Sequence, residues 1–358
     1  MNKKDFTKFK VGTVFNNCAV SKIPKAGKRV TINYPSRLEA MALDPGQIVN
    51  NNNLVYRAGQ IDVCVSLFKR ISIVRNHSGE IVITDRTPRH ALVRHAAELM
   101  RAALKVKDGF SIDVEDTVNL RHCGLGSSSS LIGGVASAIN ELYSNPIEPL
   151  HLVRYVAQNH GEEIDGEDHY LMPVQCIGGS AVCGNFSGGI IILAGEATPI
   201  AQYEISNDYR VVIGVPNDFA HPDAVKLMQD EVDNMSGFQQ TGDQYGQTIA
   251  YRLVHEAMPG LYAGNLKPVG SLIFDYRWNM GSIKNCSFVF PRMLEIAEKL
   301  RSFYKEGAAD ILSLSSVGPG FFAITKHPQK VATMFASLNM RTITTTIHNR
   351  KYAVTERL

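Results

Sequence analysis

Residues 121–130 read Arg-His-Cys-Gly-Leu-Gly-Ser-Ser-Ser-Ser, and Leu-Ile-Gly-Gly-Val-Ala-Ser-Ala-Ile-Asn-Glu-Leu-Tyr follows at 131–143. The apolar residues of the second stretch recur with the spacing of one helix face, which predicts a helix ended by Ser-Asn-Pro at 144–146. The first amides of a helix have no intrahelical partner, and the helix dipole is positive at the same end. A glycine-serine loop that opens a helix therefore predicts an anion-binding site.

The loop and its basic lead-in form one predicted phosphate-binding site. Gly124 and Gly126 allow a tight turn and a close approach of the backbone to a ligand. No Gly-Lys-Ser/Thr follows, so this is not a Walker loop, and the three spaced glycines of a dinucleotide fingerprint are missing. The alternative is a serine cap on a buried helix, with His122 packing and Cys123 structural. The predicted binding residues are Arg121, His122, Gly124, Gly126, Ser127, Ser128 and Ser129.

The composition is that of a globular protein long enough for two domains. The chain has 358 residues, of which 44% are hydrophobic and 20% charged. Its net charge of +3 is too small to favour a nucleic-acid partner. Six scattered cysteines without a Cys-x-x-Cys pair favour free thiols over zinc. No apolar segment follows the basic N-terminus, and the longest aliphatic run is too short to span a bilayer, so we expect a cytoplasmic protein without a membrane partner.

The pattern along the chain predicts two α+β domains with a boundary near residues 198–206. The alternation at 35–43 is poor for a strand, and the runs 71–74 and 81–84 are typical of a hairpin. Thr87-Pro88 predicts a helix cap followed by the first helical residue. Beyond the boundary, the order strand, helix, helix, strand, strand, helix, strand predicts a sandwich of split-βαβ type. Other predicted elements are strands at 29–34, 61–67, 111–114 and 190–193 and helices at 88–104 and 147–160.

Three stretches resemble the superfamily of galactokinase, homoserine kinase, mevalonate kinase and phosphomevalonate kinase, the GHMP kinases. They are the loop at 124–129, the acidic segment that runs from 162 into Gly178-Gly179, and Leu-Ser-Ser-Val-Gly-Pro-Gly-Phe at 314–321, where Gly318 is a candidate binding residue. As a kinase, the protein would use ATP, with Asp168 as base or charge stabiliser.

The same resemblance implies the fold. It is an α+β, GHMP-kinase-like two-domain fold. The N-terminal phosphate-loop domain at 1–200 would be ribosomal protein S5 domain 2-like, and the C-terminal domain at 201–358 would be ferredoxin-like. A homodimer is implied as well.

The segment from residue 35 to 59 differs from that of these kinases. Pro-Ser-Arg-Leu-Glu at 35–39, Leu-Asp-Pro-Gly at 43–46 and Arg-Ala-Gly at 57–59 are similar to the β-ribofuranosylaminobenzene 5′-phosphate synthases and to the C-glycoside synthases that make formycin and pyrazofurin. This similarity implies that the enzyme uses phosphoribosyl pyrophosphate (PRPP) as its substrate in place of ATP. The sugar C1 would join a ring carbon of an aromatic acid, and carbon dioxide and pyrophosphate would leave.

This similarity also implies catalytic positions. Asp44 and Arg57 fall at its ribosyl-phosphate-binding acid and arginine, and the alternatives are a turn former and a surface charge. Arg37, Arg57 or Lys284 would hold the aromatic acid, because a cation is needed opposite a carboxylate. Trp278 is either a stacking platform for the ring or a domain-interface or dimer residue.

Magnesium is the predicted cofactor, since a departing pyrophosphate needs its charge neutralised. Mg²⁺ takes a few oxygen ligands and keeps waters. The candidates for its ligands are Ser128, Glu162 and Glu163, and the alternative for the acids at 162–168 is a solvated loop.

Three functions stay open at this point. The first is a PRPP-dependent C-glycoside synthase, a phosphoribosyltransferase acting on an aromatic or heteroaromatic acid, with Asp44, Arg57 and Asp168 as catalytic residues. The second is an ATP-dependent small-molecule kinase. The third is a non-catalytic relative that binds a nucleotide or sugar phosphate as a regulatory signal.

Overall fold

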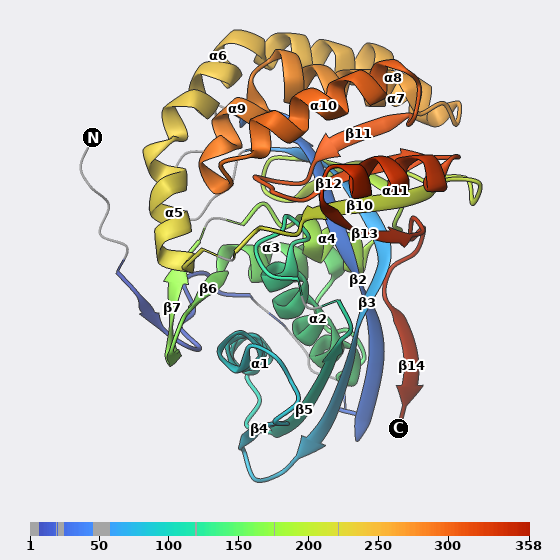
Figure 1. Cartoon of the computed structure of the whole chain (residues 1–358). Coiled ribbons are helices and arrows are strands. Elements are labelled where there is room, and N and C mark those ends of the chain that lie inside the picture. The colour runs from blue at the N-terminus through green and yellow to red at the C-terminus, as the bar shows by residue number, and fades with distance from the viewer. Residues whose placement is uncertain are drawn as a thin grey trace.

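The computed structural model contains two sheets, each covered by helices. In Figure 1 a seven-stranded sheet with helices α1 to α4 lies below, and a four-stranded sheet with the later helices lies above. A three-stranded sheet of order β1-β7-β6 lies beside them. The structure describes residues 7–18, 20, 25–45, 58–118, 120–174, 176–220 and 222–358.

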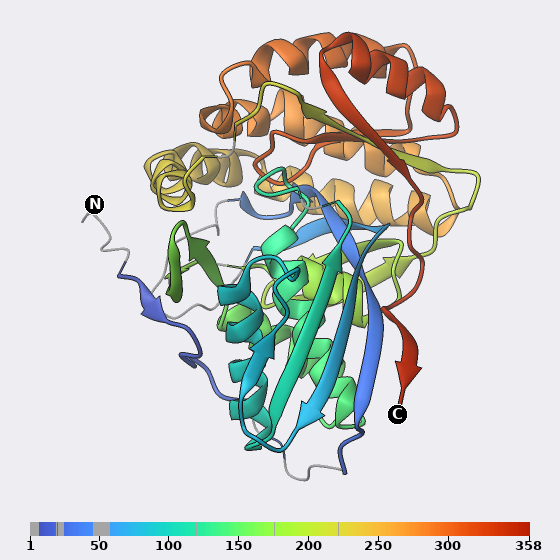
Figure 2. The same ribbon diagram turned by 60° about the horizontal axis from the view of Figure 1, so that its bottom comes forward.

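The larger sheet has the strand order β14-β2-β3-β5-β4, with β8 paired to β3 and β9 paired to β8. Its helices lie together on one face, as Figure 2 shows. The strands of this sheet are β2 (Arg29–Ala42), β3 (Gln60–Asn76), β4 (Ile81–Ile83), β5 (Gly109–Asp116), β8 (Ile190–Ala194), β9 (Thr198–Tyr203) and β14 (Ala353–Arg357). Its helices are α1 (His90–Leu104), α2 (Ser127–Leu142), α3 (Pro149–Gln158) and α4 (Gly179–Asn185). The small sheet consists of β1 (Phe9–Lys10), β6 (Gly161–Ile164) and β7 (Glu167–Pro173).

The expectation that residues 35–43 are a poor strand is wrong. The strand β2 runs without a break from Arg29 to Ala42 and pairs with β3. The register shifts at Pro35/Ser36 and again at Glu39/Met41, and each shift changes which side chains face the core. These two irregularities disturb the alternation of apolar and polar residues that identifies a strand in a sequence, so the strand was not recognised from its sequence. The same irregular part of β2 carries Arg37 and Glu39.

The helix predicted after the glycine-serine loop is present as α2 (Ser127–Leu142). Both of its faces are buried, between the sheet and the neighbouring helices, so it is the central helix of this half of the molecule. The helix expected after Thr87 starts later, at His90, and Arg89 rather than Thr87 is its N-cap. Thr87 instead accepts a hydrogen bond from the Val114 amide through its hydroxyl, at 2.9 Å.

The predicted hairpin of residues 71–84 is not formed. β3 pairs antiparallel with β5, and β4 pairs parallel with the other edge of β5. The strand β5 therefore lies between the two segments that were expected to pair. A short turn between two strand-like runs does not exclude insertion of a third strand, because sheet partners are chosen by tertiary packing.

The four-stranded sheet is antiparallel, with the order β11-β12-β10-β13. Its strands are β10 (Arg210–Pro216), β11 (Ile311–Leu314), β12 (Phe321–Thr325) and β13 (Met340–Thr345). The α-helices of this half are α5 (Ala224–Asp233), α6 (Met235–Arg252), α7 (Met258–Tyr262), α8 (Lys267–Phe274), α9 (Ser282–Cys286), α10 (Met293–Lys305) and α11 (Pro328–Ser337). Two π-helical turns, η2 (Leu253–Ala257) and η3 (Asp275–Asn279), and the 3₁₀ turn η4 (Ser287–Val289) complete it. The α+β class predicted from the sequence is confirmed.

The chain ends in the first sheet. After β13 it returns to add β14 antiparallel to β2 at the edge of the seven-stranded sheet. The two halves are thus joined by the C-terminal strand as well as by the connection from β9 to β10. All six cysteines are free. Within the described residues, no helix is both long and apolar enough to cross a bilayer.

Candidate functional site

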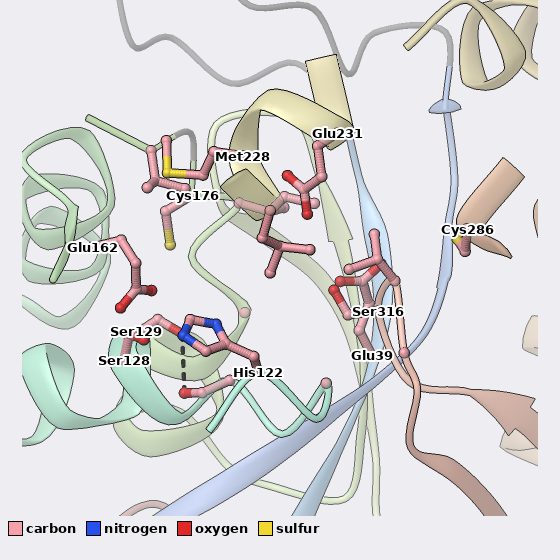
Figure 3. Close-up of a pocket in the computed structure, with 18 of the residues that line it drawn as sticks. Glu39, His122, Ser128, Ser129, Glu162, Cys176, Met228, Glu231, Cys286 and Ser316 are labelled. Atoms are coloured by element: carbon pink, nitrogen blue, oxygen red, sulfur yellow. Dashed lines mark hydrogen bonds between the residues drawn. The ribbon is translucent and has the colours of Figure 1, made fainter. Parts of the chain in front are cut away.

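A cavity of about 300 Å³ lies where the two halves of the molecule meet. Its lower wall is the loop that opens α2, together with residues of β2 and β6. Its upper wall is α5 and the turn η3, and the segment 316–318 closes one side. Figure 3 shows His122, Ser128, Ser129 and Glu162 along the lower wall and Met228 and Glu231 descending from α5.

The loop at the start of α2 is shaped by two glycines with positive φ. Gly124 has φ +82° and Gly126 has φ +63°. A Cβ on Gly124 would lie 2.1 Å from the carbonyl oxygen of Ser315, and one on Gly126 would lie 2.5 Å from Ser180 Oγ. Neither position admits a side chain, so the glycines let this loop pass between the segment at 315 and α4. Ser127, Ser128 and Ser129 then line the cavity from the first turn of the helix.

Arg89 connects this first turn to the acidic strand β6, and the sequence analysis missed it. Its guanidinium donates hydrogen bonds to Ser127 Oγ at 3.2 Å, to Ser128 Oγ at 2.7 Å and to Glu162. Its Nε lies 2.9 Å from Glu163 Oε1. The side chain is only 3% exposed. No sequence pattern singles out Arg89, because it precedes the loop by almost forty residues and only the fold brings them together.

The two acidic residues of β6 have different surroundings. Glu162 lines the cavity, whereas Glu163 faces a second hollow on the outer side and pairs with Arg89 and, at 3.0 Å, with Arg121. Burial alone would raise the pKa of Glu162, but Arg89 and His122 outweigh it and hold this pKa below its usual value. Glu162 is therefore an ionised carboxylate that faces the cavity beside Ser128.

Two of the three predicted magnesium ligands fit the ion. Glu162 and Ser128 offer oxygen atoms at the N-terminus of α2, residues 127–129, which we call the helix mouth. Mg²⁺ would complete its shell with waters and phosphate oxygens. Glu163 does not face the same space. Among the described residues, no group of three or more His, Cys, Asp or Glu side chains is arranged to hold a metal by itself. A magnesium ion here would depend on a phosphate-bearing ligand.

The irregular part of β2 contributes Arg37 and Glu39 to the cavity. Arg37 Nη1 lies 3.5 Å from Glu39, and its Nε lies 3.8 Å from Asp62 on β3. The buried Nε and Nη1 atoms make no hydrogen bond within the described part of the chain. Burial raises the pKa of Asp62 to about 7, although Arg37 and the amide of Gln60 lower it. The Arg37 guanidinium is thus held by charge between Glu39 and Asp62 at the edge of the cavity.

Several predicted residues lie elsewhere. Asp44 is half-buried after the end of β2 and does not line the cavity, and Arg57 lies outside the described residues. Asp168 is exposed on β7 and lines the second hollow, together with Arg121. Lys284 is exposed on α9. The structure thus brings together Arg37, His122, Gly124, Gly126, Ser127, Ser128, Ser129, Glu162 and Gly318.

The upper wall was not predicted from the sequence. It presents Leu227, Met228 and Phe238, with Tyr276 and Cys286 beside them. These residues come from segments that read only as amphipathic helices, in which apolar residues are expected to fill a core. Only the tertiary arrangement distinguishes an apolar residue at a cavity from one in the core.

Glu231 is the one carboxylate that α5 turns toward the cavity. Burial, together with the charges of Glu39 and Glu162, raises the pKa of Glu231 to about 7. Its carboxylate forms no hydrogen bond or ion pair with any residue that the structure describes.

Arg277 ties the upper wall to the lower one. This fully buried side chain donates through Nε to the Ala40 carbonyl at 2.9 Å and through Nη1 to the Ser316 carbonyl at 3.0 Å. It also reaches the Glu39 carbonyl, the Ser313 hydroxyl and the Ser282 hydroxyl. Its neighbour Trp278 lies in the core of the C-terminal half, where it stacks on Phe274 at 4.6 Å, and it does not line the cavity as a stacking platform for a ring would.

The fold and the cavity define a class: a two-domain α+β protein in which the glycine-serine start of a helix faces a cavity between the halves. Residues 91–179 match the family described as GHMP kinases N terminal domain. The chain has the GHMP-kinase fold. No curated protein matches its sequence.

Solved structures with the same fold are distant in sequence. Mevalonate pyrophosphate decarboxylase from Streptococcus pyogenes is 14% identical, with a TM-score of 0.62 over 91% of this chain and 98% of the other. L. major mevalonate kinase in complex with R-mevalonate is 15% identical, with a TM-score of 0.61 over 91% and 99%. Homoserine kinase from Cytophaga hutchinsonii is 13% identical, with a TM-score of 0.58 over 93% and 99%. At this identity the likeness concerns the fold alone.

Proposed function

We propose that the protein is a PRPP-dependent C-glycoside synthase. It joins C1 of ribose 5-phosphate to a ring carbon of an aromatic or heteroaromatic carboxylic acid and releases carbon dioxide and pyrophosphate. One observation carries the proposal: a single cavity combines an anion-binding helix mouth, oxygen ligands for Mg²⁺ and an apolar wall suited to a flat ring. A wall of leucine, methionine, phenylalanine and tyrosine is typical of sites that bind aromatic ligands.

The helix mouth would bind the leaving group. The amides of Ser127 to Ser129 and the positive end of α2 favour a diphosphate. Glu162 and Ser128 would hold Mg²⁺, which neutralises the charge that develops on the departing pyrophosphate. Arg89 keeps these two side chains in place through its hydrogen bonds. Stabilising that charge is the largest requirement of a reaction with an oxocarbenium-like centre.

Arg37 is the cation of the cavity best placed for the rest of the substrates. Arg37 lines the cavity, and a guanidinium binds phosphate and carboxylate equally well. Arg37 also belongs to the segment from 35 to 59, and the similarity of that segment to the C-glycoside synthases is a second reason to propose this role. The roles of Asp44 and Arg57 at the ribosyl phosphate remain predictions.

An ATP-dependent kinase is the alternative, and the cavity supports it no better than the synthase, since the start of α2 suits either phosphate ligand. Its proposed base, Asp168, is exposed outside the cavity. Distant neighbours with this fold include a pyrophosphate decarboxylase as well as kinases, so the fold does not favour phosphoryl transfer either.

The decisive experiment is incubation of the full chain with Mg²⁺, PRPP and a panel of acids: 4-aminobenzoate, 4-hydroxybenzoate and a pyrazole dicarboxylate. We expect pyrophosphate and carbon dioxide in equal amounts with at least one acid, and none without an acid. Absence of pyrophosphate with every acid at high enzyme concentration would contradict the proposal. A thermal-shift comparison is the control, in which stabilisation by ATP but not by PRPP would support the kinase.

A further inference from the structure

The half-buried side chain of Glu231 lines the cavity, and its carboxylate has no hydrogen-bond or ion-pair partner among the residues that the structure describes. It projects from α5 into the cavity, and Glu162, Ser128 and His122 lie across from it (Figure 3). The side chains around it on α5 and α6 are apolar, including Leu227, Met228 and Phe238. A carboxylate that is partly withdrawn from water by apolar side chains loses hydration that the protein does not replace here. Its presence on an apolar wall points to a partner supplied by the ligand.

We propose that Glu231 selects acceptors that carry an N–H or O–H group on the ring, by accepting a hydrogen bond from that group. For the class of its ligand, this inference rests on the proposed function. The ring would lie against the apolar side chains of the upper wall, and the diphosphate would lie at the helix mouth opposite. The donor group of the ring would then point away from PRPP and toward α5.

The chemistry of the proposed reaction gives this hydrogen bond a second effect. The ring attacks the sugar C1 with a pair of its π electrons while the C1–O bond breaks and its electron pair leaves with pyrophosphate. The bond from the ring to its carboxylate then breaks, its electron pair restores the aromatic ring, and carbon dioxide leaves. A para amino or hydroxyl group donates electron density during the attack, and its hydrogen becomes more acidic.

A hydrogen bond from this group to a carboxylate is therefore stronger in the transition state than in the bound substrate, which raises the rate as well as the affinity. No proton is consumed, because any proton drawn toward Glu231 returns when aromaticity is restored. A pKa of Glu231 raised to about 7 by burial and by Glu39 and Glu162 fits a carboxylate that shares a hydrogen with a ligand near neutral pH.

The test is a binding comparison of two nearly isosteric acids, 4-aminobenzoate and 4-methylbenzoate, by calorimetry on the full chain with Mg²⁺ and pyrophosphate present. The wild type should bind 4-aminobenzoate about ten- to a hundredfold more tightly, the range for a hydrogen bond to a charged group. Glu231→Leu should reduce this preference to about twofold or less and leave the affinity for 4-methylbenzoate within about twofold. Glu231→Gln keeps a carbonyl acceptor and should retain part of the preference.

Asp230→Asn is the matched control, because Asp230 is the next carboxylate on α5 but pairs with Lys226 at 2.6 Å outside the cavity. It should keep the wild-type preference. The inference is overturned if the wild type binds both acids equally or neither, or if Glu231→Leu retains the preference. It is also overturned if Glu231→Leu shifts only the Mg²⁺ requirement, since Glu231 would then be a metal ligand.

Pyrophosphate release from PRPP, measured in parallel, separates the two proposals. If the protein prefers 4-aminobenzoate but releases no pyrophosphate, the synthase proposal is contradicted and the role of Glu231 in ligand selection stands. If the protein releases pyrophosphate but does not prefer 4-aminobenzoate over 4-methylbenzoate, the synthase proposal stands and the role of Glu231 is contradicted.

Discussion

The two walls of the cavity satisfy their polar groups in different ways. On the lower wall, Arg89, Ser128 and Glu162 are joined to one another, so the positions of hydroxyl and carboxylate are fixed before any ligand arrives. On the upper wall, apolar side chains surround a single carboxylate, Glu231, which lacks a protein partner among the described residues. The first arrangement suits a ligand of constant chemistry such as a diphosphate, because preorganised charges need not be rearranged. The second suits recognition of one variable group by its hydrogen bond.

Of the substitutions considered, loss of Arg277, which joins the two walls, should lower the stability of the protein most. Replacement of Arg277 by Met removes donors from the buried carbonyls of Ala40 and Ser316 and from two buried hydroxyls. Each unsatisfied buried group costs about 1–3 kcal/mol, so the free energy of unfolding should fall by at least about 3 kcal/mol. Chemical denaturation measures this loss. Arg301→Met, which removes two long hydrogen bonds and an exposed ion pair with Glu298, should cost less than about 1 kcal/mol.

The lower wall should show its importance in the metal dependence of turnover. Glu162→Gln should lower pyrophosphate release at least about a hundredfold and raise the Mg²⁺ concentration required, because a charged oxygen ligand is lost at the helix mouth. Glu163→Gln is the matched control, since Glu163 faces the outer hollow. It should cost at most about tenfold, through Arg89 alone. Equal losses in both variants would remove the distinction between the two acids.

Asp62, the buried acid beside Arg37, should make the free energy of unfolding depend on pH. The pKa of Asp62 is about 7 in the folded chain, above the value of about 3.9 for an unfolded aspartate. The folded state thus retains a proton that the unfolded state loses, and stability falls as pH rises from about 4 to about 7, by at most about 1.4 kcal/mol per pH unit. Asp62→Asn should abolish this contribution in unfolding experiments across that range. A wild-type stability curve parallel to that of the variant would contradict the assignment.

The smallest effect is expected at Asp168, which the sequence analysis named as a catalytic residue of both the synthase and the kinase. Asp168→Asn should change pyrophosphate release by less than about twofold, since the side chain is exposed and outside the cavity. A loss of a hundredfold or more would instead restore Asp168 to a catalytic role.

Much of the lower wall was predictable because its chemistry lies in one continuous stretch. The loop from Gly124 to Ser129 carries glycines for its turn, serines for its helix start and apolar residues for its burial, and each signal is local. The sequence identified Glu162 and Glu163 together as candidate ligands, but it did not show that they face different spaces. Neighbouring residues of a strand point to opposite sides, so Glu162 meets the cavity while Glu163 meets the outer hollow.

The strand β2 shows where a local pattern misleads. Two register shifts interrupt its alternation, and the expectation of a poor strand followed from that interruption. Those irregularities lie in the part of the strand that carries Arg37 and Glu39 to the cavity.

The sequence by itself determined the helix mouth, the α+β class and the candidate ligands Ser128 and Glu162, because each depends on spacing along a few dozen residues. Only the tertiary structure revealed the contacts of Arg89 and Arg277 and the position of Glu231 in the cavity. Arg89 reaches a helix almost forty residues later, Arg277 binds carbonyls more than two hundred residues earlier, and Glu231 faces residues of the other half. Such partners are set by how the two halves pack, and no local periodicity records that packing.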